Sequence, residues 1–180
     1  MQLAIFRSRP NVGRYRPQEG NHGCFAVGGA NGYSVTMPTP DETWDSVFVA
    51  LERLRARWPL TDWTYDRRLK CVASSIPLSD EAAARASFAD VLSGVWSTAT
   101  LPGAPDGIRV FSESCGGVRA TQQLLWGGEP DGPGAFGLWW PWGDGTTVTL
   151  RIGLHNVDLP KERYPRLRTL FGIPQASGPA

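Results

Sequence analysis

The strongest hydrophobic pattern in the chain is helical and follows Thr39. Apolar side chains recur every three or four residues between positions 44 and 54, which indicates a helix with one buried face. Thr39 is suited to be the N-cap, Pro40 fits the first helical position, and Glu42 completes a capping box. Because a proline cannot continue a helix, Trp58-Pro59 is expected to end it.

Two further helices are expected. Ser79 is placed to cap the second helix. Its apolar face would consist of Phe88, Val91, Leu92, Val95 and Trp96. A short C-terminal helix is expected to run from Tyr164 to Phe171, because Gly172 is a typical stop and Pro165 fits only the first turn.

Most of the remaining apolar segments have the alternation or the short length that is typical of strands. Apolar and polar residues alternate from position 147 to 154, after a turn at Asp144-Gly145, and Asn31-Gly32 suits the tight turn of another hairpin. The predicted strands span residues 3–6, 24–28, 33–37, 63–71, 108–113, 118–126, 135–140 and 146–154.

These elements together predict an α+β fold. Short hairpin connections favour a mostly antiparallel sheet of about six to seven strands, with two longer helices and one short C-terminal helix packed on one face. The chain has 180 residues and no linker that separates two apolar cores, so we expect a single domain over residues 1–174. Residues 175–180 are small and polar, and we expect them to fray.

Composition and charge narrow the function classes. The 18 basic and 17 acidic residues nearly cancel, so the chain as a whole is not strongly attracted to nucleic acid or to a membrane. No apolar run approaches the roughly 20 residues of a membrane helix, and the first residues lack the order of a secretory signal. Three widely spaced cysteines do not make a disulfide framework, which favours the cytoplasm.

Tryptophan and arginine provide the main functional indication. In Trp139-Trp140-Pro141-Trp142 successive indoles must point to opposite faces of a strand, so at least one is expected to be exposed or covered by another element. Such residues dominate the energetics of protein interfaces. We therefore expect a non-enzymatic protein-binding module, such as an inhibitor, an immunity-type protein or a dedicated chaperone. The predicted binding residues are Trp139, Trp140, Trp142, Trp63, Tyr65 and Arg67.

A cysteine-dependent enzyme is the first alternative. Cys115 precedes Gly116-Gly117, where backbone N–H groups in an exposed turn could stabilise a thiolate. His22 or His155 would serve as the base, oriented by Glu113 or Asp158. The simpler interpretation of this segment is a hairpin turn between two strands, with the cysteine as a small buried residue.

Two weaker alternatives concern metal and nucleic acid. His22 and Cys24 stand two residues apart and could share one face of a strand, but no zinc-site spacing supplies two further ligands. Basic residues are concentrated in segments 1–20 and 53–70, which could hold single-stranded nucleic acid if the fold brings them together. No cofactor is predicted. A protein partner is expected first, nucleic acid second, and no membrane.

Overall fold

The fold is described from a computed structural model of the chain, over residues 39–156 and 159–174. All of these residues belong to one compact unit, Met37–Ala180. The strands expected within residues 1–37, together with His22 and Cys24, lie outside the described ranges. The prediction of a single domain with a frayed tail includes those residues, so it stays a prediction.

Helix α1, Pro40–Arg57, forms as the sequence predicts. The Thr39 hydroxyl accepts a hydrogen bond from the Glu42 amide at 3.3 Å, and the Glu42 carboxylate accepts one from the Thr39 amide at 2.7 Å. This capping box satisfies amide groups that otherwise lack partners at the start of a helix. The buried face of α1 consists of Trp44, Phe48, Leu51 and Leu54.

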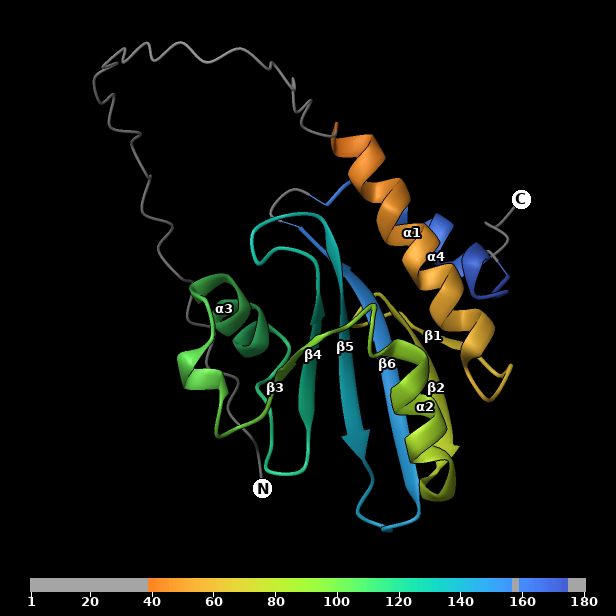
Figure 1. The fold of residues 1–180 in the computed structure, drawn as a ribbon, viewed down its shortest axis with the longest axis vertical. Helices are drawn as coiled ribbons and strands as arrows, with labels where there is room; N and C mark the ends of the chain where they lie inside the picture. Colours follow the sequence, from red (N-terminus) through yellow and green to blue (C-terminus); the bar gives the residue numbers. More distant parts are fainter. Residues whose placement is uncertain (1–38, 157–158, 175–180) are drawn as a thin grey trace, which may run out of the picture. The chain divides into compact units, whose positions relative to one another are not determined.

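The centre of the fold is a six-stranded sheet in the order β1-β2-β6-β5-β4-β3 (Figure 1). Its strands are β1 (Thr64–Asp66), β2 (Cys71–Pro77), β3 (Gly94–Trp96), β4 (Gln123–Gly127), β5 (Gly134–Pro141) and β6 (Thr147–His155). Every neighbouring pair is antiparallel. The predicted α+β class and antiparallel sheet are therefore confirmed.

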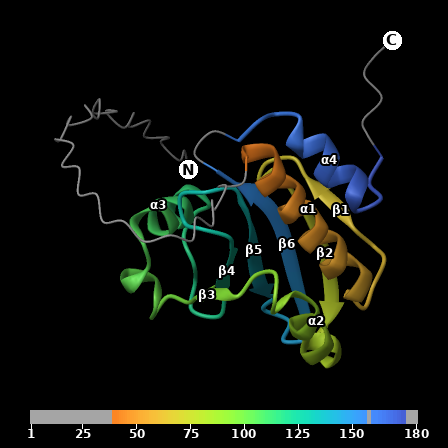
Figure 2. The same ribbon diagram turned by 45° about the horizontal axis from the view of Figure 1, so that its top comes forward.

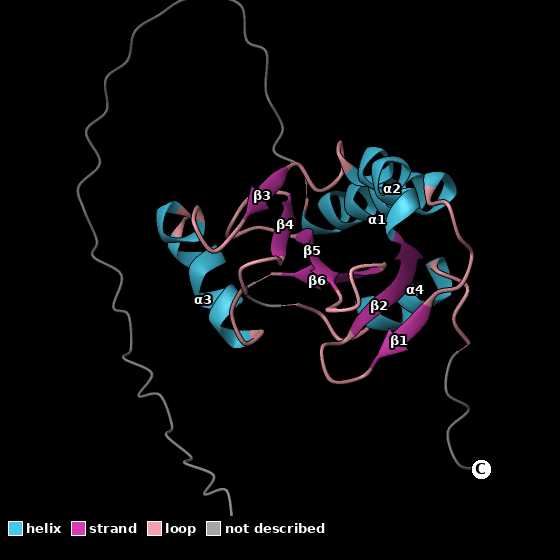
Figure 3. Ribbon diagram, turned by 90° about the horizontal axis from the view of Figure 1, so that it is seen from below, coloured by secondary structure: helices cyan, strands magenta, loops and turns pink. Residues whose placement is uncertain are grey.

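Helices cover the two faces of this sheet unequally. The remaining helices are α2 (Glu81–Phe88), α3 (Asp106–Ser114) and α4 (Arg163–Leu170). Buried side chains of α1, α2 and α4 share one apolar cluster with one face of the sheet, whereas α3 packs on the other face, against Trp126 and Phe136 (Figure 3). The expectation that the helices lie on one face is thus wrong for α3.

The α3 segment is also the clearest error in the predicted elements. Residues 108–113 were expected to form a strand, but they lie within α3. Ile108 and Ser112 are buried and Phe111 packs beside them, which is the spacing of one helical face. Pro105 precedes the helix and Asp106 occupies its first turn, where a carboxylate is favourable. These two residues were a helix-start signal.

Further segments also differ from the prediction. Residues 118–122 precede β4 instead of belonging to a strand, and Ser79 does not cap α2, whose N-cap is Asp80. Residues 63–71 form part of a β1–β2 hairpin rather than one strand. The Asp66 carboxylate accepts hydrogen bonds from the amides of Arg68 and Leu69, which stabilises the turn. Lys70 closes this turn with a φ of +51°. The helix expected to include Trp96 ends instead at Phe88, and residues 94–96 pair with β4 as an edge strand.

No helix in the described part of the chain combines the length and the apolar character that crossing a membrane requires.

Candidate functional site

The three tryptophans around Pro141 have three different environments. Trp139 is 1% exposed and packs under α2, with its ring 5.6 Å from that of Phe88. Trp140 points to the opposite face of the sheet, where it is half-buried, and Trp142 is 55% exposed. The expectation that at least one of these indoles is exposed is confirmed by Trp142.

The other predicted binding residues do not join this group. Trp63 belongs to the cluster beneath α1 and α4, with its ring 4.5 Å from Phe171. Tyr65 packs against the same cluster and lies 4.9 Å from the Arg168 guanidinium. Arg67 is exposed in the β1–β2 turn. Of the six predicted binding residues, the structure brings together Trp140 and Trp142.

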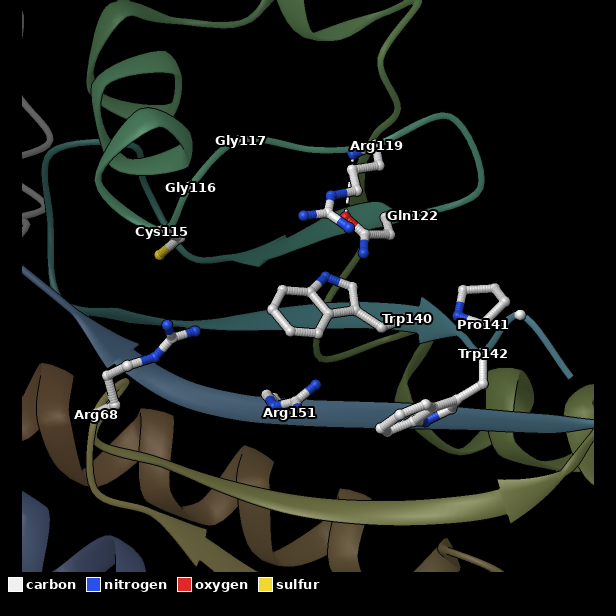
Figure 4. Close-up of a pocket in the computed structure, with 11 residues that line it drawn as sticks. Arg68, Cys115, Gly116, Gly117, Arg119, Gln122, Trp140, Pro141, Trp142 and Arg151 are labelled. Carbon is white, nitrogen blue, oxygen red and sulfur yellow. Dashed lines mark hydrogen bonds between the residues drawn. The ribbon is translucent and has the colours of Figure 1, made fainter. Parts of the chain in front are cut away.

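These two tryptophans line a cleft of about 510 Å³ on the half of the sheet that α3 leaves uncovered (Figure 4). We call it the Arg–Trp cleft. Its polar and aromatic lining comes from the β1–β2 turn, the loop after α3, and strands β5 and β6. The residues of this lining that carry the argument are Arg68, Arg119, Gln122, Trp140, Trp142 and Arg151.

Arg151 forms part of the cleft floor. In β6 the residues on either side of it, Leu150 and Ile152, are fully buried on the helix-covered face, so Arg151 must point to the other face. Its guanidinium lies 4.3 Å from the centre of the Trp140 ring. Its Nε is 3.5 Å from the Asp66 carboxylate, and both Nε and Nη1 are buried without a hydrogen-bond partner.

Arg68 and Arg119 stand on opposite walls of the cleft, and Figure 4 shows their side chains extending toward the space around Trp140. A hydrogen bond from the backbone amide holds the chain at each of these two positions. The Arg68 amide donates to Asp66 at 2.9 Å, and the Arg119 amide donates to the Gln122 side chain at 3.0 Å. Neither guanidinium forms a hydrogen bond or an ion pair with another described residue. Among the described residues, no carboxylate lines the cleft.

The C-terminal turn of α3 completes one wall. Gly116 and Gly117 adopt φ values of +94° and +77°, which end the helix and which side chains rarely tolerate. Carbonyl groups at this end of a helix carry partial negative charge. The positive charge of the cleft therefore comes from its arginine side chains.

Trp142 is held in place at the rim. Its indole N–H donates to the Thr149 hydroxyl at 2.7 Å, and that hydroxyl lies 2.7 Å from the Ser75 hydroxyl. The polar atom of the indole is therefore satisfied within the chain. The ring offers an apolar surface of fixed orientation beside the arginines.

No protein-family model, curated protein or solved structure matches this chain. The function is consequently argued from the site alone.

Of the residues in the cysteine hypothesis, Cys115 lines the Arg–Trp cleft and His155 lines a different pocket. Cys115 is the C-cap of α3 rather than part of a hairpin turn, because residues 106–114 are helical. Burial raises the pKa of its thiol, and a hydrogen bond from Ser114 opposes this only in part. Glu113 is exposed on α3, and Asp158 lies outside the described residues. Among the described residues, no hydrogen bond joins Cys115 to His155.

His155 instead fastens the β4–β5 hairpin to β6. Its ring stacks on Trp126 with centroids 3.7 Å apart, and its Nε2 lies 2.9 Å from the Gly127 carbonyl. Burial lowers the pKa of the imidazole, against the effect of hydrogen bonds to the Gly127 and Gly132 backbone. This environment favours the neutral ring. The metal candidates His22 and Cys24 lie outside the described residues.

The basic segment 53–70 does not form one surface. Its first part lies on α1, where Arg57 pairs with Asp90 at 2.6 Å, on the helix-covered side of the sheet. Arg68, at its other end, lines the Arg–Trp cleft. Segment 1–20 lies outside the described residues.

Four residues of the cleft were missed from the sequence: Arg68, Gln122, Arg119 and Arg151. One signal was present, since an arginine in a strand whose other face is wholly apolar must lie on the opposite face. That signal marks Arg151 but not its neighbours. Arg68 and Arg119 come from loops more than 50 positions apart, and only the folded chain brings them to one cleft.

Proposed function

We propose that this protein is a non-enzymatic cytoplasmic binding module that holds an acidic segment of a partner protein in the Arg–Trp cleft. The observation that carries the proposal is a cleft whose described lining contains three arginines and no carboxylate. An inhibitor, an immunity-type protein or a dedicated chaperone would use such a site to grip its partner.

The energetic basis is the incomplete pairing of these arginines. A guanidinium stays charged at any ordinary pH, so a poorly paired one costs free energy as it loses water. Arg151 already has two buried nitrogens without a hydrogen-bond partner. A carboxylate in the cleft would neutralise part of this charge, and arginine binds carboxylates in a two-pronged geometry. An acidic segment therefore complements the site.

Binding is favoured over catalysis by the chemistry of the single thiol in the cleft. Because burial raises the pKa of Cys115, the thiol and not the nucleophilic thiolate predominates at neutral pH. We expect iodoacetamide to alkylate Cys115 no faster than it alkylates a free-cysteine peptide, with Cys115→Ser used to assign the product. Alkylation well above the peptide rate would favour the enzyme hypothesis instead.

The binding proposal is tested with the full tagged chain and two variants. A partner protein captured from the native cells is purified, and its affinity is measured for the wild type, for Arg119→Gln and for Arg67→Gln. Arg67 is the matched control, because it is an exposed arginine that does not line the cleft. Loss of one charge-assisted pair should weaken binding about tenfold in Arg119→Gln and leave Arg67→Gln unchanged.

Two results would contradict the proposal. Equal affinities of the two variants for the purified partner would place the contact elsewhere. Tighter binding of a single-stranded oligonucleotide than of any protein, lost in Arg119→Gln, would assign the cleft to nucleic acid.

A further inference from the structure

Three arginines elsewhere in the described part of the chain share one arrangement: each stacks on an aromatic ring and also pairs with a carboxylate. Arg168 differs, because it lies over Tyr65 and bonds to the Pro174 carbonyl instead. In the contact between α1 and α4, Arg163 lies over Trp44 at 5.9 Å and bonds to Asp41 at 2.5 Å. One turn further along α4, which lies beside α1 in Figure 2, Arg166 lies over Phe48 at 4.0 Å and bonds to Asp45 at 2.6 Å. Both arginines therefore have a ring and an anion.

A third example lies on α2, over the sheet. Arg85 of α2 is 4.5 Å from the Trp139 ring, 2.7 Å from the Glu81 carboxylate and 3.0 Å from the Gln123 side-chain oxygen. The stacked guanidinium is again satisfied by oxygen atoms of the chain.

In the Arg–Trp cleft the same arrangement has a weaker carboxylate partner. Arg151 stacks on Trp140 as closely as the others stack on their rings, but its nearest carboxylate is 3.5 Å away and gives no hydrogen bond. Arg68 and Arg119 have no carboxylate partner among the described residues. These arginines are therefore available to carboxylates that the described residues do not supply.

The aromatic side of the cleft is also incomplete. Trp142 is 55% exposed, its N–H is already bonded to Thr149, and its ring stands beside Trp140 at the rim. An exposed indole held in one orientation is the kind of surface that a partner's aromatic side chain covers at an interface, and aromatic pairs gain beyond simple burial.

We infer, on the basis of the proposed function, that the bound segment carries an aromatic residue next to its acidic residues. The carboxylates pair with Arg68 and Arg119 on the two walls, above Arg151. The aromatic ring packs on Trp142 at the rim. The partner chemistry is thus an acidic–aromatic peptide segment, and each half of it has its own residues in the cleft.

The test uses three short peptides, acetylated and amidated so that their ends carry no charge. The first has a phenylalanine flanked by aspartates, the second replaces the phenylalanine with leucine, and the third replaces the aspartates with asparagines. Binding to the full chain is measured by calorimetry without a dye, since common dyes are themselves anionic and aromatic. We expect the leucine peptide to bind about fivefold more weakly than the first. The asparagine peptide is expected to show no saturable binding.

Variants of the protein assign each half of the peptide to its residues. Trp142→Leu should remove the preference for phenylalanine over leucine, whereas Trp142→Phe, which keeps a ring, should retain most of it. Arg68→Gln should weaken both acidic peptides about tenfold, and the neighbouring control Arg67→Gln should leave them unchanged.

The outcomes separate this inference from the proposed function. Equal affinity for the phenylalanine and leucine peptides, both dependent on Arg68, would overturn the aromatic requirement and leave the acidic one. Absence of binding by every peptide at low salt, where charge attraction is strongest, would contradict both. Tighter binding of a single-stranded oligonucleotide than of the first peptide would overturn both in favour of nucleic acid.

Discussion

The contact between α1 and α4 and the Arg–Trp cleft use the same pair of residue types in opposite ways. On the helices, Arg163 and Arg166 each stack on a ring and bond to an aspartate. In the cleft, Arg151 stacks on Trp140 but has no hydrogen bond to its carboxylate. Arg163 and Arg166 thus each have a hydrogen-bonded carboxylate, although the Nε of Arg163 is also buried without a partner, whereas Arg151 has only the longer ion pair with Asp66.

This difference separates arginines that stabilise the fold from arginines that are available for binding. A paired and stacked guanidinium contributes to folding and has little left to offer a partner. A guanidinium without a carboxylate partner adds positive potential to a cleft. When its backbone is already held in place, it loses less conformational entropy on binding an anion than it would on a mobile loop. Counting arginines in the sequence cannot make this distinction, because both kinds look alike there.

The largest effect is expected from reversing the charge of the cleft arginines. Arg68→Glu combined with Arg119→Glu replaces two attractive charges with two repulsive ones, so the affinity for an acidic peptide should fall by at least about a hundredfold. The same reversal at Arg163 should leave that affinity unchanged, because Arg163 does not line the cleft. Calorimetric titration measures both. A comparable loss in the Arg163 variant would end the distinction between the two regions.

The complementary effect concerns stability. Arg163→Gln should lower the free energy of unfolding by about 1 kcal/mol, mainly through lost packing on Trp44. The ion pair itself adds little, since the Asp41 side chain is 85% exposed and water screens it. Urea denaturation of this variant and of Arg119→Gln makes the comparison. Arg119→Gln should stay within about 0.5 kcal/mol of the wild type. An equal loss in both would mean that the cleft arginines also stabilise the fold.

These expectations show which parts of the molecule the sequence reveals. The start of helix α1 is predicted to the residue because Thr39, Pro40 and Glu42 act on one another locally. Strand β6 is predicted almost as closely, because its alternation is long and regular. Where the local hydrophobic pattern and the local chemistry agree, the sequence alone is sufficient to predict the element.

The errors arise where distant contacts decide. Residues 88–96 have perfect helical spacing, yet the last three of them pair with β4 because the sheet has an edge there. The β1–β2 turn contains no glycine or asparagine that would predict it from the sequence. Its left-handed residue is Lys70 instead. The cleft arginines were missed for a related reason. Their meeting point depends on α3 covering only half of a sheet face, which no local pattern encodes.

A smaller effect should follow from removing the one nearby negative charge. Asp66→Asn deletes the carboxylate that lies 3.5 Å from Arg151, while its amide oxygen can still accept the turn hydrogen bonds. The cleft becomes more positive, so an acidic peptide should bind about threefold more tightly at low salt. Calorimetry at two salt concentrations measures the gain, which should shrink as salt rises. Weaker binding of Asp66→Asn would contradict the electrostatic account.

The smallest expected effect is a pH dependence of stability that comes from His155. Its ring stacks on Trp126, as the arginines stack on their rings, but a histidine can lose its positive charge near neutral pH. Burial places its folded-state pKa below the ordinary value of 6.5. The unfolded chain therefore binds more protons below that pH, so stability is present above about pH 6.5 and falls as pH drops through the folded pKa. Exposed carboxyls with lowered pKa, such as those of Asp90 and Asp144, titrate below their ordinary value of 3.8.

Urea denaturation from about pH 7.5 to about pH 5, the range in which histidine titrates, measures this dependence. The His155→Gln variant, which lacks the imidazole ring, is the comparison. The wild type should lose stability over this interval and the variant should lose less. The same slope in both proteins would show that another group is responsible.

The most direct test of the account is to observe the two sets of arginines in one experiment. Nuclear magnetic resonance resolves the Nε–H signals of arginine and the indole N–H signals of tryptophan during titration with the aspartate–phenylalanine peptide. The account predicts saturable shifts at Arg68, Arg119, Arg151 and the two cleft tryptophans, with Arg163 and Arg166 unmoved. Shifts centred on the α1–α4 contact, or spread evenly over all arginines, would contradict it.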